Sequence, residues 1–209
     1  MDISLTEYIN QHYANIVEGY SQQIPRQVEI LESYAKDAKN ILEIGFNAGH
    51  SAEVFLRANP LCSVTSFDIG FGDHLELGKN YIDINYPDRH TLIRGDSTLT
   101  IPEYIKNEPN KKFDILFIDG GHSYEVALAD LENCAHLATK DSIVLMDDTI
   151  YTENLVRDWT EGPTQAWLTG LRLGLITEIG REDWIHGRGM SWGFYPSSNL
   201  RQPSCISGL

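Results

Sequence analysis

Residues 40–51 read NILEIGFNAGHS, an apolar run that ends in a glycine-containing turn, and this stretch decides the fold. The apolar run has the length and composition of a buried strand, and residues 52–57 continue with helical spacing. Gly45 and Gly49 let the backbone of the turn approach a ligand, toward which the amides of the next helix would point. The stretch predicts an α/β unit with a ligand site at the strand end, although a plain strand-to-helix turn would have the same pattern.

The same alternation of short apolar runs and helical patterns continues along the chain. Four further runs have the character of strands, at residues 63–67, 90–94, 113–118 and 142–146. An apolar helical stripe is clearest after residue 122. Short strands joined by helices predict a Rossmann-like, doubly wound α/β sheet that is mostly parallel. Two later runs, 175–179 and 190–195, flank a long connection over 180–189 and predict an antiparallel strand pair, which makes seven strands in all.

Three segments differ in pattern along the sequence. Residues 1–39 form a lead with two helical patterns, at 5–17 and 25–38. Residues 40–195 hold the strand and helix alternation and are expected to form the main domain. Residues 196–209 are polar, contain Pro, Ser and Gly, and are expected to fray.

Composition excludes several classes of protein. Among 209 residues, 16 are Lys or Arg and 30 are Asp or Glu, so the formal charge is −14, which argues against a nucleic-acid partner. An apolar content of 42% is ample for a globular core. The three cysteines are far apart and suggest neither disulfides nor a thiolate zinc site. The sequence shows no basic and apolar leader and no long apolar run, so we expect a cytoplasmic protein without a membrane partner. Self-association is compatible with the sequence.

Acidic residues follow two of the expected strands and could bind an adenosine. Asp68 comes 23 residues after Gly45, where an acid can accept hydrogen bonds from ribose hydroxyls. Asp96 and Ser97 follow the next strand and could face an adenine. The alternative for both acids is a helix cap. The spacing G-x-x-x-G, with Asn47 inside it, differs from the dinucleotide fingerprint and argues against NAD.

A second group of acids follows the expected strands at 113–118 and 142–146. Asp119 is followed by His122, and Asp147 is followed directly by Asp148. Parallel neighbouring strands would bring these carboxylates to one edge of the sheet. Carboxylates that lie close together disfavour one another's charge, so a cation is expected there, with Mg²⁺ preferred and Mn²⁺ or Ca²⁺ able to substitute. The alternative is that these acids cap helices or are solvated.

Together, these motifs on successive strand ends resemble the S-adenosylmethionine site of class I methyltransferases. The resemblance covers about residues 25 to 195 and implies seven strands with the last one antiparallel. It also implies that S-adenosylmethionine is the cofactor. The residues that would bind it are Glu43, Gly45, Asn47, Gly49, Ser51, Asp68, Asp96, Ser97 and Asp119.

The acidic group is similar to that of metal-dependent O-methyltransferases. Catechol O-methyltransferase-like enzymes hold Mg²⁺ with an Asp and a later Asp-Asn pair, and a basic residue lies three positions after the first Asp. Here that residue is His122, and the later pair is acidic, as in the magnesium-dependent macrolide sugar O-methyltransferases. The resemblance implies that Asp119, Asp147 and Asp148 hold the metal. It further implies that His122 is the general base, acting beside Asp119.

The acceptor is expected to bind at loops on the rim of the sheet. Tyr151, Trp184, His186 and Arg188 are the candidate contacts, although Trp184 could instead be a hydrophobic plug. The short lead favours a small molecule or a glycan end, and a sugar hydroxyl is the first choice. A catechol or another phenol is the alternative acceptor. The alternative classes are a metal-dependent hydrolase and a cofactor-binding module without catalysis.

Overall fold

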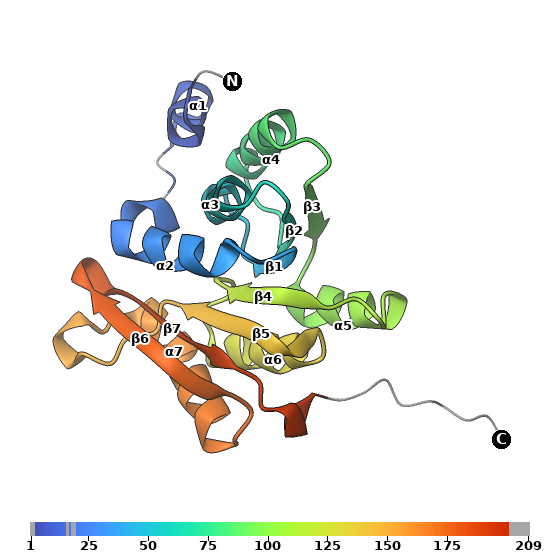
Figure 1. The fold of residues 1–209 in the computed structure, drawn as a ribbon. Coiled ribbons are helices and arrows are strands. Elements are labelled where there is room, and N and C mark those ends of the chain that lie inside the picture. Colours follow the sequence, from blue (N-terminus) through green and yellow to red (C-terminus); the bar gives the residue numbers. More distant parts are fainter. Residues whose placement is uncertain (1–2, 16, 18–19, 201–209) are drawn as a thin grey trace.

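The computed structural model describes residues 3–15, 17 and 20–200 (Figure 1). The α-helices are α1 (Leu5–His12), α2 (Pro25–Ala35), α3 (His50–Ala58), α4 (Asp73–Asn85), α5 (Ser97–Asn107), α6 (Tyr124–Ala135) and α7 (Asp158–Arg172). The strands are β1 (Asn40–Ile44), β2 (Ser63–Asp68), β3 (His90–Arg94), β4 (Phe113–Ile118), β5 (Ala138–Asp147), β6 (Thr177–Trp184) and β7 (Arg188–Phe194). Short 3₁₀ helices are η1 (Ser21–Gln23), η2 (Glu153–Leu155), η3 (Ile185–Gly187) and η4 (Ser197–Asn199).

The seven strands form one sheet in the order β3-β2-β1-β4-β5-β7-β6. Neighbours among β1 to β5 pair in parallel, and β7 is antiparallel to both β5 and β6. The sheet order reverses beside β1, where the chain first runs outward to β3 and later returns to β4. This arrangement confirms the Rossmann-like, mostly parallel sheet with an antiparallel end. It also places the ends of β1, β2 and β4 at one edge, where open α/β sheets bind ligands.

Helices cover both faces of the sheet, which explains why the central strands are apolar on both sides (Figure 1). Successive side chains of β1 point to opposite faces, so Ile41 packs with residues of α1 to α4 and Leu42 packs with residues of α5 to α7. The same alternation in β4 sends Phe117 to the first core and Leu116 to the second. Two cores therefore hold the sheet rigidly between them and fix the edge where its strands end.

The strongest helical pattern in the sequence gives α6. Ser123 caps this helix, because its side chain accepts a hydrogen bond from the amide of Val126 at 3.3 Å. Ala127, Leu131 and Cys134 are buried against the sheet, as the apolar stripe predicted. The cap fixes the start of α6 directly after His122, and so limits the length of the loop that follows β4.

The final hairpin differs from the expectation of a long connection over residues 180–189. Strand β6 continues to Trp184 and β7 already begins at Arg188, so only the three residues of η3 separate them. Strand β6 lies at the sheet edge, and alternate residues along it are exposed. A polar edge strand therefore had no continuous apolar run by which the sequence could mark it.

Other boundaries also shift. The two lead helices end at His12 and Ala35, before the expected limits of 17 and 38, and β5 begins at Ala138, before the expected 142. The fraying expected for the polar tail falls largely on residues 201–209, which lie outside the described residues, and the division into three segments stays a prediction. Within the part of the chain that the structure describes, no helix has the length and hydropathy needed to cross a membrane.

Candidate active site

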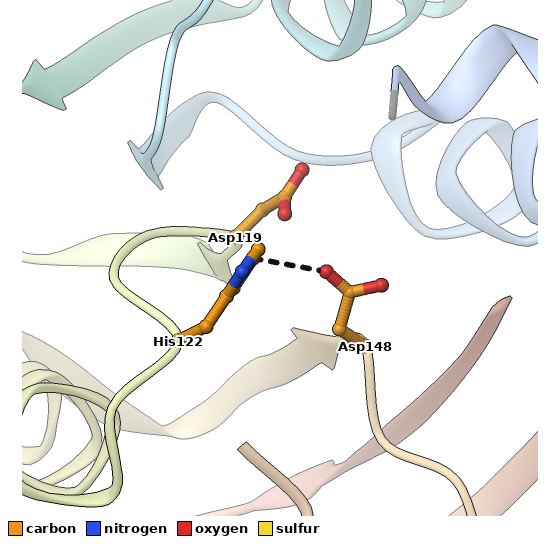
Figure 2. Close-up of side chains that lie close together, drawn as sticks. All are labelled: Asp119, His122 and Asp148. Carbon is orange, nitrogen blue, oxygen red and sulfur yellow. Dashed lines mark ion pairs between the residues drawn. The ribbon is translucent and has the colours of Figure 1, made fainter. Parts of the chain in front are cut away.

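The ends of β4 and β5 bring three acids together at one edge of the sheet. Ile118 pairs with Met146 in the register of these strands, so the residues that follow them are neighbours. Asp119, His122 and Asp148 each offer a potential ligand atom, and these atoms all lie within 4.8 Å of one another. Figure 2 shows their side chains together, with the first two on the segment after β4 and the third after β5. Two of the three predicted metal ligands, Asp119 and Asp148, thus lie together with His122.

His122 and Asp148 form the direct contact within this cluster. The Nε2 atom of His122 lies 3.1 Å from Oδ2 of Asp148 (Figure 2). Asp148 has a φ of 56°, an uncommon value for a residue other than glycine, whereas His122 is 45% exposed in its side chain. A cavity of about 10 Å³ lies beside them and is lined by Asp119, Asp147 and both contact residues. This volume holds about one water-sized sphere, which suits a small ion.

The carboxylates of the cluster lie so close together that they disfavour one another's negative charge. Burial raises the pKa of Asp119 well above its usual range, and the charges of Asp147 and Asp148 raise it further. Burial and the neighbouring Asp148 likewise raise the pKa of Asp147. The hydrogen bond to Asp148 raises the pKa of His122. The site therefore favours added positive charge, whether a proton or a metal ion supplies it.

Arg188 lies in this cluster, whereas the sequence suggested a rim residue that contacts the acceptor. Its NH2 atom lies 3.1 Å from Oδ2 of Asp147, and its Nε atom lies 3.5 Å from Oδ1 of Asp148. The side chain of Arg188 is only 10% exposed. Since the guanidinium already faces these acids, its expected contact with the acceptor is confined to the small part that remains exposed.

Among the residues that the structure describes, two buried carboxylate oxygens of the cluster have no hydrogen-bond partner. These are Oδ1 of Asp147 and Oδ1 of Asp148. Buried polar atoms normally have a partner, because an unsatisfied one costs about 1–3 kcal/mol. Carboxylate oxygens beside a small cavity are the donors that Mg²⁺ and Mn²⁺ prefer. Asp119 and Asp148 therefore offer oxygen donors that fit a hard divalent cation, and Asp147 as a third ligand stays a prediction.

The glycine turn after β1 packs directly on the start of the acidic segment. The amide of Asp119 donates to the carbonyl of Ile44 at 2.8 Å. Gly45 has a φ of +92°, and a Cβ atom there would lie 1.8 Å from the carbonyl oxygen of Asp119. Only glycine fits such an approach. The two predicted binding segments are thus physically joined at this residue.

Asp68 shapes the same turn. One carboxylate oxygen accepts hydrogen bonds from the amides of Phe46 and Asn47, both at 2.9 Å, and the other accepts from the amide of Gly70 at 2.7 Å. An ionised carboxylate has about four acceptor positions, so room remains for a ribose hydroxyl. Gly49 is the N-cap residue of α3 and has a φ of 86°. The turn is therefore held from β2 before any ligand binds.

Glu43 and Ser51 bond to each other below this turn. The Ser51 hydroxyl donates to the carboxylate of Glu43, which also accepts from Ser66. Glu43 is fully buried, and this burial raises its pKa to about 7. Both residues thus support the turn from inside, and their contact with a cofactor stays a prediction.

Asp96 is the N-cap of α5, the alternative left open by its position in the sequence. Its carboxylate accepts from the amide of Thr98 at 2.9 Å and from the Thr98 hydroxyl at 2.7 Å. Ser97 is the first residue of the helix. Asp96 is exposed and Ser97 is half-buried, and the predicted adenine contact stays a prediction.

The remaining candidates for contact with the acceptor, Tyr151, Trp184 and His186, differ in how far their side chains are engaged by the protein. The Tyr151 hydroxyl lies 3.0 Å from Oγ of Ser191, and Arg181 stacks over the Tyr151 ring. Trp184 packs against the core on the side of α2, as expected for a hydrophobic plug. His186 is exposed in the η3 turn, with a φ of 63°. Of these three residues, His186 is the one whose side chain is free to meet an acceptor.

A family model described as a methyltransferase domain matches residues 42–149, more than half of the chain. This match spans the glycine turn, Asp68, Asp96 and the whole acidic cluster. The chain belongs to this methyltransferase family. No curated protein shows significant sequence similarity to it.

Solved structures share the fold of this methyltransferase along almost its whole length. An O-methyltransferase from Bacillus cereus, in complex with SAH, is 18% identical, with a TM-score of 0.72 and coverage of 91% of this chain and 90% of that chain. A putative caffeoyl-CoA O-methyltransferase from Staphylococcus aureus is 17% identical, with a TM-score of 0.68 and coverage of 91% and 90%. A TDP-rhamnose 3′-O-methyltransferase of calicheamicin biosynthesis is 21% identical, with a TM-score of 0.61 and coverage of 90% and 86%. At these identities the likeness establishes the fold.

Two buried polar residues of the methyltransferase domain and its lead were missed by sequence reasoning. Gln27 of α2 is fully buried, and its Oε1 atom lies 3.5 Å from NH2 of Arg188. Asp130 is fully buried on α6, and its carboxylate has Ser97 as its near polar neighbour among the described residues. Asp130 lies three residues after Ala127 in the apolar stripe, a signal that could have identified it. Nothing in the sequence around Gln27 indicated its contact, because that contact joins residues 161 positions apart.

Proposed function

We propose that this protein is a divalent-cation-dependent O-methyltransferase. It transfers the methyl group of S-adenosylmethionine to a hydroxyl of a sugar or glycoside. The observation that carries the proposal is the cluster of Asp119, His122, Asp147 and Asp148, which lies beside the glycine turn of a methyltransferase domain. A methyl donor held at that turn would meet an acceptor held at the acids.

The proposed cofactor site follows the strand edge from β1 to β4. Gly45, Asn47 and Gly49 would face the methionine part of S-adenosylmethionine, supported from inside by Glu43 and Ser51. Asp68 would accept from the ribose, and Asp96 with Ser97 would face the adenine. The likeness to a SAH-bound O-methyltransferase supports this placement.

The proposed reaction forms one bond and breaks one. The acceptor oxygen uses a lone pair to form the new C–O bond to the methyl carbon, while the electron pair of the broken C–S bond stays on sulfur. S-adenosylmethionine supplies a methyl group that is already activated by the positive sulfonium. The hydroxyl proton passes to a base on the protein, and the products are the methyl ether and S-adenosylhomocysteine. The chain's task is therefore to orient the acceptor and remove one proton.

His122 is the proposed base. It is half-exposed at the mouth of the cluster and an imidazole can accept a proton near neutral pH. A divalent cation held by Asp119, Asp147 and Asp148 would lower the pKa of an acceptor hydroxyl. Because the same carboxylate of Asp148 raises the pKa of His122, a cation on Asp148 would weaken that contact and leave the imidazole neutral. Asp148 thereby links metal binding to the readiness of the base.

A neutral acceptor suits the charge of the molecule. The formal charge of −14 disfavours polyanionic substrates. The fold likeness to a TDP-rhamnose 3′-O-methyltransferase supports a sugar, and exposed His186 at the rim could donate a hydrogen bond to one. Tyr151, Trp184 and Arg188 keep lesser proposed roles in the acceptor pocket, since their side chains are largely engaged by the protein.

Calorimetry tests the cofactor step. Titration of the purified protein with S-adenosylmethionine is expected to show binding at one site per chain. The matched variant Asp68→Asn should bind more weakly, because an amide has one acceptor oxygen where the carboxylate has two, and its hydrogen bonds are no longer charge-assisted. If the unaltered protein bound none of the cofactor, the proposed methyltransferase activity would be wrong.

Turnover tests the acceptor class. Methyl rhamnoside and a catechol are offered side by side with S-adenosylmethionine and Mg²⁺, and the products are identified by mass spectrometry. We expect methylation of the glycoside at the higher rate. Preference for the catechol would replace the sugar by a phenol, and phosphatase activity without the cofactor would indicate a metal-dependent hydrolase.

A further inference from the structure

Among the described residues, Arg188 is the one largely buried Arg or Lys that contacts the acids of the cluster. Its NH2 atom lies 3.1 Å from Oδ2 of Asp147 and 3.5 Å from Oε1 of Gln27. Its Nε atom faces Oδ1 of Asp148 at 3.5 Å. The exposed fraction of the side chain is 0% for Asp147 and 10% for both Arg188 and Asp148. These contacts are shielded from solvent, so water and salt screen the attraction between the charges less than in a surface ion pair.

The hairpin is built so that β7 delivers this guanidinium. Gly189 follows Arg188, and a Cβ atom there would lie 2.4 Å from the carbonyl oxygen of Thr149. The absence of a side chain lets the start of β7 pass directly over the loop that follows Asp148. On the other side, Gln27 closes the space from α2. Arg188 is thus fixed by three separate elements of the fold.

The position of Arg188 reduces the net negative charge of the cluster. Asp119, Asp147 and Asp148 together carry −3 when ionised, and Arg188 adds +1, so the cluster carries −2 with His122 neutral. The acids face Arg188 from β4 and β5, and Gln27 adds no charge. Arg188 stays protonated, because a guanidinium keeps its charge in proteins. A cluster of −2 matches the charge of one divalent cation, whereas −3 would leave one negative charge after binding.

We propose that Arg188 is a built-in countercharge of the acidic cluster. It pairs with Oδ2 of Asp147 and Oδ1 of Asp148, leaves Oδ1 of Asp147 without a hydrogen-bond partner among the described residues, and lets the protein fold while no metal is bound. A divalent cation then binds against this resident charge. Arg188 is therefore a positioning residue that sets how strongly the acids hold a cation. The inference rests on the cation site of the proposed function.

The test is a titration with Mn²⁺ alone, followed by electron paramagnetic resonance, on the full-length protein. Arg188→Met removes the charge and keeps much of the side-chain volume, whereas Arg188→Lys keeps the charge. We expect Arg188→Met to bind Mn²⁺ about threefold more tightly or better, because a repulsive charge near the ion is gone. Arg188→Lys should bind within about twofold of the unaltered protein, since its charge is the same. An affinity that is unchanged or weaker in Arg188→Met overturns the proposal.

Thermal unfolding gives a second measurement that does not depend on catalysis. Without a resident countercharge, Arg188→Met should melt at a lower temperature in EDTA and gain more from Mn²⁺ than the unaltered protein does. A variant that is unfolded in EDTA and folds when Mn²⁺ is added gives the same result in stronger form. A variant that Mn²⁺ stabilises no more than it stabilises the unaltered protein, or that stays unfolded in both conditions, contradicts the proposal.

The outcomes also separate this inference from the proposed function. If the unaltered protein binds Mn²⁺ and Arg188→Met binds it no better, only the role of Arg188 fails. If the unaltered protein binds none and Arg188→Met does, the countercharge stands and the cation-dependent step of the proposed function fails. If neither protein binds Mn²⁺, both are wrong.

Discussion

At the scale of single residues, His122 is the side chain on which the proposed chemistry depends. It lies within ion-pair distance of Asp148 yet remains half-exposed, so it can reach an acceptor without leaving the cluster. Its partner is buried and fixed at the end of β5. A half-exposed base beside a buried acid allows proton transfer and metal binding to be tested separately by substitution.

Substitution of His122 should therefore lower the rate and spare the metal. His122→Ala is expected to reduce kcat by about 10²-fold or more, the usual contribution of a general base. Mn²⁺ affinity should change by less than about threefold, because three carboxylates remain. Initial rates and metal titrations on the same preparation check this, and an unchanged rate would mean that another group removes the proton.

Asp130 is a second residue with a measurable consequence, this time for stability. Burial raises its pKa to about 7, from an ordinary value of 3.8. Between those values the folded protein holds a proton that the unfolded chain has lost, so stability falls as pH rises through this window. Asp130→Asn removes the titration and should gain up to roughly 4 kcal/mol over the unaltered protein between pH 4 and pH 8.

Urea unfolding at several pH values measures that difference. The control is Asp141→Asn, since Asp141 is exposed and paired with Lys140 at the surface. The advantage of Asp130→Asn should grow steadily with pH, whereas the control should show no such trend. A constant difference between Asp130→Asn and the unaltered protein at every pH would show that Asp130 keeps its ordinary pKa.

At the residue scale, the sequence predicted the acids better than their partners. Asp119, Asp147 and Asp148 follow apolar strands, and position after a strand is a local signal. The pairing of Arg188 with Asp147 joins residues 41 positions apart, and that of Gln27 joins residues 161 apart. Such contacts depend on how the hairpin and α2 fold back over the sheet, which no local pattern encodes.

At the scale of elements, the junction between the β1 turn and the end of β4 couples the two halves of the site. The carbonyl of Asp119 occupies the space where a side chain at position 45 would lie. The hydrogen bond between Asp119 and Ile44 holds the same junction. A change at Gly45 therefore moves both the turn and the first acid.

Gly45→Ala should disturb both functions of the site at once. We expect a loss of about 3 kcal/mol in stability, from steric overlap and left-handed backbone strain, together with loss of S-adenosylmethionine and Mn²⁺ binding. Gly174→Ala is the matched control, because Gly174 also has a positive φ but no atom lies within 4 Å of an added Cβ. It should cost about 1 kcal/mol and leave both ligands bound. Equal behaviour of the two variants in denaturation and calorimetry would exclude the coupling.

Elements with continuous apolar runs were predicted closely, and polar ones were not. Strands β1, β3 and β4 have the expected limits, and nearly every residue of β1 and β4 is buried. Strand β6 extends well past the expected residue 179 because its edge position permits charged residues. This error affected the predicted site, because the sequence placed Arg188 in a loop whereas Arg188 is the first residue of β7.

At the scale of the whole molecule, the net charge of −14 is unevenly distributed, and part of it lies in the site. Three of the acids are concentrated at one edge of the sheet and are partly balanced by Arg188. With that residue counted, a bound divalent cation would bring the cluster from −2 to 0. A neutral site surrounded by an acidic surface favours an uncharged acceptor such as a sugar or a small diol.

The central claim is that this methyltransferase domain uses a cation at its acidic cluster to methylate a hydroxyl. The most direct measurement is the rate of methyl transfer from S-adenosylmethionine to methyl rhamnoside, in Mg²⁺ and in EDTA, for the unaltered protein and for Asp148→Ala. We predict turnover in Mg²⁺ that disappears in EDTA and returns when the metal is restored, no turnover for Asp148→Ala in either condition, and cofactor binding in both proteins. Full activity in EDTA would contradict the account.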